Sequence, residues 1–125
     1  MTAVARPDGR SQGDAGERKP LGTFGRYAGP ATLILSSLAE GAKHGYALTR
    51  DIEDFSGVRL APGTLYEALS RLEAQGLIQA LDSADRRKPY QLTGTGAAAL
   101  RAHLDDQRRV ADVGLRRLAA SWDLS

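Results

Sequence analysis

Polar side chains share one side of a predicted helix in the stretch GTLYEALSRLEAQGLI, residues 63–78. Leu65, Leu69 and Leu72 follow one another at spacings of four and three, which places them on one apolar face of an amphipathic helix. The opposite face carries hydroxyl, carboxylate, guanidinium and carboxamide groups. Such groups hydrogen-bond to base edges in a nucleic acid, and they are also ordinary on a solvated surface. The residues of this face are Thr64, Glu67, Ser70, Arg71 and Gln75.

Three successive cations form a second candidate group, in the polar turn DSADRRKP at residues 82–89. Apolar and polar residues alternate on both sides of this turn, in LIQAL (77–81) and YQLT (90–93), as expected of two paired strands. Cations at the tip of such a ribbon suit the phosphates of a nucleic-acid backbone, although a charged hairpin tip is also common. The three residues are Arg86, Arg87 and Lys88.

The residue types that catalysis and metal binding need do not occur in the required contexts. The chain has no Cys, and His103 stands without a second His or a spaced carboxylate pair on the predicted last helix. Neither a nucleophile with its base nor a phosphate-cradling glycine loop is present. We therefore expect no enzyme, no metal and no cofactor. His44 is expected to cap or pack at a turn rather than bind a ligand or sense pH. Trp122 is expected to seal the end of the dimerisation helix rather than stack on a flat ligand.

Composition predicts one small domain. The chain has 125 residues and a net charge of +2, and a core of that size is only marginally stable without a partner chain. The excess of positive charge lies outside residues 30–81, and that segment itself is net negative. No apolar run is long enough for a signal peptide or a membrane span, and the lack of Cys suits a reducing compartment, so we expect a soluble, cytoplasmic chain with no membrane partner.

Helix boundaries follow from Gly, Pro and the apolar spacing. Residues 1–29 are rich in Gly, Arg and Pro and predict a flexible arm. One helix is expected from Pro30 to Gly41, and a second from about Gly45 to Gly57. The third helix begins either at Pro62 or at a capping Thr64 paired with Glu67, and it ends at Gly76.

Apolar residues also mark faces on the second and last helices. The second is expected to bury Leu48, Ile52 and Phe55. The last, from Thr95 to about Ala120, carries a seam typical of helix pairing, which Gln107 and Gly114 interrupt. The seam comprises Leu100, Leu104, Ala111 and Leu118.

The order of these elements predicts a mostly α fold with a two-stranded β wing, a winged helix-turn-helix over residues 30–93 followed by a C-terminal dimerisation helix over 94–125. In that fold the third helix enters the major groove of DNA and the ribbon touches the flanking backbone. Arg71 would then donate two hydrogen bonds to a guanine, or it would only pair with Glu67 one turn back. A winged helix that binds another protein without DNA is the alternative function.

We expect the last helices to pair in a homodimer. Each last helix should also pack on the partner's first helix, where Leu33 and Leu35 provide a second apolar side. Two-fold symmetry would present two copies of the third helix to DNA. The operator is then expected to be a double-stranded inverted repeat with half-sites about one helical turn apart.

Three stretches, HGYAL, PGTLYEALSRLEAQGLI and RRKPYQLTGTG, resemble the signature segments of PadR-family transcriptional regulators, and the resemblance runs from about Pro30 to Leu118. It implies a bacterial dimeric repressor that a small-molecule effector releases from DNA, in the smaller class with a single C-terminal helix. By position it implies DNA contacts from Thr64, Tyr66 and Arg71, and wing contacts from the three cations. The Tyr66 hydroxyl is expected to reach a phosphate while its ring packs under the first turn.

The sequence departs from the family pattern at three places. Ala61 stands where a helix-capping Ser is common, and Pro89 replaces one residue of the usual aromatic pair before Tyr90. The predicted arm is longer than in most members. In addition, no Trp lies between Thr95 and Ser121 to form the aromatic effector pocket of some small members.

Overall fold

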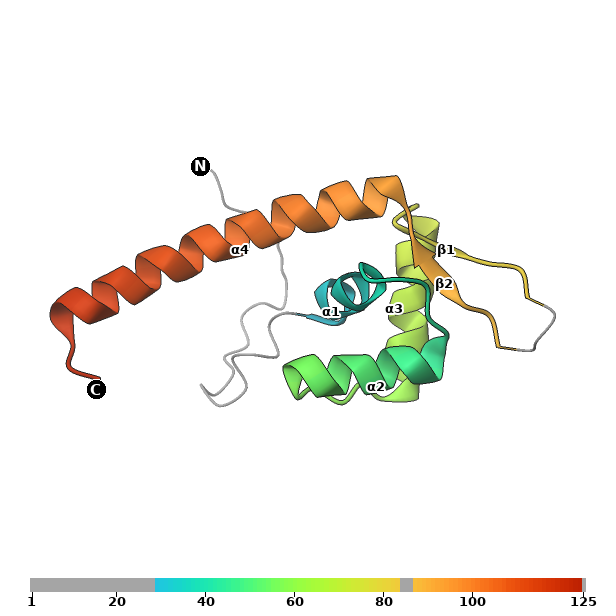
Figure 1. Ribbon diagram of the computed structural model, residues 1–125, viewed down its shortest axis with the longest axis horizontal. Helices are drawn as coiled ribbons and strands as arrows, with labels where there is room; N and C mark the ends of the chain where they lie inside the picture. The colour runs from blue at the N-terminus through green and yellow to red at the C-terminus, as the bar shows by residue number, and fades with distance from the viewer. Residues whose placement is uncertain (1–28, 84–86, 125) are drawn as a thin grey trace.

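The computed structural model describes residues 29–83 and 87–124, in which three short helices precede a two-stranded ribbon and a long last helix (Figure 1). This order confirms the predicted winged helix-turn-helix with a C-terminal helix. Most of the predicted arm and Arg86 lie outside the described residues, and Gly29, assigned to the arm from the sequence, is the first helical residue. The elements are α1 (Gly29–Leu38), α2 (Gly45–Ser56), α3 (Pro62–Ala74), β1 (Ile78–Ala80), β2 (Tyr90–Leu92) and α4 (Gly94–Ser121).

Helix α1 occupies the centre of the core. It contacts α2 and α3 on one side and the start of α4 on the other, as Figure 1 shows. Leu33 and Leu35 on α1, expected to be covered by a partner's last helix, are each only 6% exposed within their own chain. That expectation was wrong, because α1 is covered by three helices of its own chain. The core residues are Leu33, Ile34, Leu35, Leu38, Leu48, Ile52, Leu60, Leu65, Leu69, Leu72, Ile78 and Leu100.

Helix α2 begins and ends at capping residues. His44 is its N-cap, and Nδ1 accepts a hydrogen bond from the Ala47 amide at 3.5 Å, which confirms the predicted capping role. Gly57 ends the helix in the left-handed conformation, with φ of 77°. Phe55 was expected in the core but is half exposed, since it lies on the last turn of α2.

Helix α3 begins at Pro62, one of the two starts that the sequence allowed. Ala61 is the N-cap in extended conformation, and no side chain caps the first turn. The alternative capping box between Thr64 and Glu67 is therefore absent. Glu67 forms an ion pair with Arg71 instead.

The base of the wing, where β1 begins and β2 ends, is held against α3 and α4. Strands β1 and β2 pair antiparallel, with Ile78 opposite Leu92. Thr93 caps α4, accepting from the Gly96 amide at 3.0 Å and donating to the Gly76 carbonyl at 2.7 Å. A Cβ at Gly96 would lie only 2.9 Å from the carbonyl carbon of Leu77, so the first turn of α4 fits against the wing only with glycine there.

Helix α4 is 28 residues long, about 42 Å at 1.5 Å per residue, and only its beginning belongs to the core. Its distal half extends away from α1, α2 and α3 in Figure 1. Leu100 was assigned to the dimerisation seam, but it is 7% exposed and packs in the core of its own chain. Within the described residues, none of the helices has the length and apolar character that crossing a membrane requires.

Candidate nucleic-acid interface

One side of α3 carries the polar residues that the sequence singled out. The apolar side of this helix is buried by Leu65, Leu69 and Leu72, which leaves the other side uncovered by the rest of the chain. Because the start of α2 and the wing flank this side, a ligand that met α3 would also meet both neighbours. The exposed residues on this side are Thr64, Tyr66, Glu67, Ser70, Arg71 and, at the C-cap, Gln75.

Arg71 pairs with Glu67 in the unbound chain. The guanidinium Nη2 lies 3.2 Å from Oε2 of Glu67, and the two side chains are 67% and 71% exposed. An exposed pair at this spacing contributes only about 0.3–0.5 kcal/mol. It is therefore too weak to keep Arg71 from a stronger bidentate acceptor.

Tyr66 crosses from α3 to the first residue of α2. A Cβ at Gly45 would overlap the Tyr66 hydroxyl and would lie 3.0 Å from Cζ of the ring. Only the absence of a side chain at Gly45 leaves room for the Tyr66 ring and hydroxyl, a role that was not predicted from the sequence. Local patterns gave no signal for this contact, because it depends on how α2 and α3 meet. Tyr66 itself is 51% exposed.

A hollow of about 360 Å³ lies between the start of α2, α3 and the wing. Cations from the wing, phenol rings and the first amides of α2 surround it, a combination that suits a phosphate group. Partial burial, followed by the charge of Glu73, raises the pKa of Tyr90, so this phenol stays neutral at pH 7. The lining residues are His44, Gly45, Tyr46, Tyr66, Arg87, Lys88 and Tyr90.

A second hollow, of about 710 Å³, lies between α2 and the beginning of α3. Arg50 lines it and donates to the Tyr46 hydroxyl at 3.1 Å, with its guanidinium carbon 5.8 Å from the centre of the tyrosine ring. This hydrogen bond is the main reason that the pKa of Arg50 is raised, which keeps the side chain charged. Neither residue was predicted to belong to a site, although their spacing of four on a helix places them side by side.

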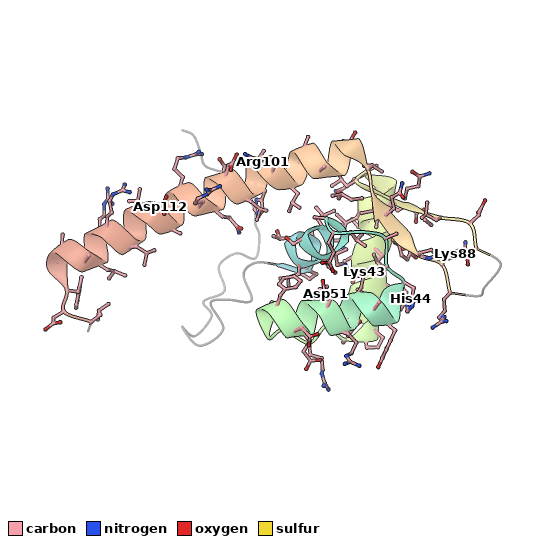
Figure 2. The ribbon with its side chains drawn as sticks, viewed as in Figure 1. Lys43, His44, Asp51, Lys88, Arg101 and Asp112 are labelled. Atoms are coloured by element: carbon pink, nitrogen blue, oxygen red, sulfur yellow. The ribbon has the colours of Figure 1, made fainter. Side chains whose placement is uncertain are left out.

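The wing presents exposed cations beyond the start of α2. Arg87 and Lys88 are exposed, and Figure 2 shows Lys88 on the projecting ribbon, beyond His44. Arg86, the third predicted wing cation, lies outside the described residues.

The distal part of α4 keeps its apolar residues in contact with solvent. Leu104 and Leu118 are 37% and 40% exposed, and Ala111 is exposed as well. Leu115 and Trp122, 65% and 67% exposed, extend the same side of the helix. Trp122 is therefore largely exposed within its own chain. We call Leu104, Ala111, Leu115, Leu118 and Trp122 the α4 stripe.

No metal centre is evident in the part of the chain that the structure describes. Among residues 29–83 and 87–124, no three His, Cys, Asp or Glu side chains converge so that they could hold an ion.

Comparison with known proteins agrees with this geometry. The family model for PadR-like transcriptional regulators matches residues 34–102. The transcriptional regulator Rv3488 of Mycobacterium tuberculosis is 41% identical over 70 residues, which make up 54% of this chain and 64% of that protein. An uncharacterised 37.1 kDa protein in transposon TN4556 of Streptomyces fradiae is 44% identical over 78 residues, 62% of this chain and 23% of the relative.

The fold is also similar to that of a solved PadR-family structure. A PadR family transcription regulator from Clostridium difficile has a TM-score of 0.66 and 30% identity, covering 71% of this chain and 97% of that one. The chain spans less than two thirds of the length of the two curated relatives. The fold and the interface define a winged helix-turn-helix protein. The chain belongs to the PadR-like family of transcriptional regulators.

Proposed function

We propose that this protein is a sequence-specific DNA-binding regulator that acts as a homodimeric repressor. This proposal rests on the uncovered polar side of α3. The wing cations flank this side, as does the hollow of about 360 Å³ between the start of α2, α3 and the wing. Rv3488 and the Clostridium difficile protein are both named as transcription regulators, which favours a binding role over catalysis. Release from the operator by a small-molecule effector is carried over from the family.

Each part of the interface has a distinct role in this proposal. Helix α3 lies in the major groove, where the forked Arg71 guanidinium reads guanine O6 and N7 and the hydroxyls of Thr64 and Ser70 reach neighbouring acceptors. A backbone phosphate occupies the hollow between the start of α2, α3 and the wing, where it accepts hydrogen bonds from Tyr66 and Lys88. Base contacts then supply specificity, and phosphate contacts supply most of the affinity.

The α4 stripe is the proposed dimer contact. Its exposed apolar side chains continue the side of α4 on which Leu100 enters the core. A second copy of the same helix would remove this apolar surface from water. The two-fold axis then repeats the α3 helices along one face of DNA, which requires an inverted repeat with half-sites about 10 base pairs apart.

Selection of DNA fragments from the genome of the source organism tests the proposal. We expect the purified protein to enrich a small set of fragments and to protect an inverted repeat within them from nuclease cleavage. A winged helix that recognises only another protein would enrich no sequence. That result would reject DNA binding and leave the fold assignment intact.

Removing the wing cations should weaken binding to every DNA. With Arg87→Ala and Lys88→Ala combined, we expect affinity for the operator and for unrelated DNA to fall by the same factor, because phosphates carry no sequence information. The slope of log affinity against log salt should decrease by about one unit for each lost contact. Titrations at several salt concentrations measure both quantities. The matched control replaces Arg116 and Arg117 of α4, and an unchanged slope in the wing variant would exclude the wing from the interface.

Filling the space at Gly45 should act through Tyr66. We expect Gly45→Ala to displace the phenol and to lower operator affinity by about 0.5–1.5 kcal/mol, the contribution of one hydrogen bond. Tyr66→Phe should cause a similar loss, and the two changes together should cost no more than either alone. Gly94→Ala is the control, since no atom lies within 4 Å of a Cβ built there. Fully additive losses, measured on the same operator, would show that Gly45 and Tyr66 act independently.

A further inference from the structure

Lys43, in the loop between α1 and α2, holds its charged end inside the protein. The side chain is only 14% exposed, and Nζ donates to the Ser37 carbonyl at 2.5 Å. Nζ also lies 2.9 Å from Oε2 of Glu40 and 3.7 Å from Oδ2 of Asp51. Figure 2 shows Lys43 and Asp51 facing one another between α1 and α2.

Ser37 completes the connection between the two helices. Its hydroxyl, on a residue that is 1% exposed, donates to Oδ2 of Asp51 at 2.6 Å. The lysine ammonium and the serine hydroxyl therefore meet on one carboxylate oxygen. A covered ammonium needs such acceptors, because an unpaired charge is costly to remove from water. These contacts fix the position of the loop.

The main chain of Lys43 binds the wing. Its amide donates to the Tyr90 carbonyl at 3.0 Å, and its carbonyl accepts from the Tyr90 amide at 2.9 Å. Tyr90 is the first residue of β2, and Lys88 precedes it by two positions. A shift of residue 43 would therefore move the strand that carries the wing cations.

We propose that Lys43 is a positioning residue, which sets the wing against the helix-turn-helix and contributes to DNA affinity only through the wing. The proposal rests on the DNA-binding function proposed above. The ammonium points into the protein and is not itself a phosphate contact. Its loss should therefore appear as a loss of wing contacts.

A double-mutant cycle with the wing tests this role. Lys43→Met keeps an unbranched side chain of similar length and removes the ammonium. We expect it to weaken operator binding about fivefold and to lower the slope of log affinity against log salt. In a protein that already carries Arg87→Ala and Lys88→Ala, the same change should weaken binding less than about twofold. Asp51→Asn should show the same dependence on the wing if Lys43→Met does not fold. Glu40→Gln is the control, since Glu40 is 69% exposed and Lys43 keeps its other two partners.

Amide hydrogen exchange provides a second readout that needs no DNA. The Tyr90 amide should exchange about tenfold faster in Lys43→Met than in the wild type, while the amides in the middle of α3 stay unchanged. Equal loss of affinity in both backgrounds, or unchanged exchange at Tyr90, would overturn the positioning role. If the wild type bound no DNA, the proposed function would fail, and the exchange experiment would still decide whether Lys43 positions the wing.

Discussion

Replacing Leu104 and Leu118 together by Asp should convert the protein to monomers and remove most of its operator affinity. Both residues lie on the α4 stripe and outside the core, so the winged helix itself should still fold. In a dimer four carboxylates, two from each protomer, would be buried against apolar side chains, which is strongly unfavourable. A monomer engages one half-site alone and loses the gain from linking two, about 100-fold or more. Light scattering at micromolar concentration and operator titration measure the two effects.

The opposite side of α4 offers a matched control. Ala102 and Ala120 are exposed and lie about half a turn around the helix from the stripe, two positions from Leu104 and Leu118. Asp at both positions adds the same charge, and we expect this protein to remain a dimer with normal affinity. The dimer contact proposed for the stripe would be wrong if the Leu104 and Leu118 variant still dimerised, or if the wild type were a monomer.

Arg71→Ala should lower operator affinity by about 1–3 kcal/mol and flatten the preference at one base pair, because a bidentate contact to guanine discriminates against every other base. Binding to a set of operators that differ only at that base pair measures the change. The loss should be largest for the operator with guanine there.

Arg101→Ala is the control for this change. Arg101 is 78% exposed and lies 3.4 Å from Asp105, four residues on, so it forms the same kind of ion pair as Arg71 but on α4. We expect its replacement to leave the base preference unchanged. If Arg71→Ala weakened all sequences equally, Arg71 would be a phosphate contact and not a reader of bases.

Local patterns were enough to predict the elements of this fold. Leucines at helical spacing identified α3, and Pro62 and Gly57 act where helices begin or end. The alternation around the charged turn identified the ribbon. These signals act within a few residues of chain, so they can be read from the sequence without knowledge of the tertiary structure.

Contacts between distant segments were beyond such patterns. The fit of Tyr66 over Gly45 and the bonds of Lys43 to Tyr90 depend on how three elements meet. The predicted seam on α4 shows the same limit, because its first residue belongs to the core and the others do not. Periodicity alone could not reveal that Leu100 enters the core of its own chain while Leu104 remains exposed.

We propose that this protein binds DNA through phosphate contacts and reads one sequence through α3. The most direct test is a titration of the selected operator and of a scrambled duplex of the same composition, at salt concentrations from about 50 to 200 mM. We expect affinity for both to fall linearly on logarithmic axes, with the operator bound at least about 1,000-fold more tightly and by two protomers. Binding that did not respond to salt, or equal affinity for the two duplexes, would contradict this mode of DNA recognition.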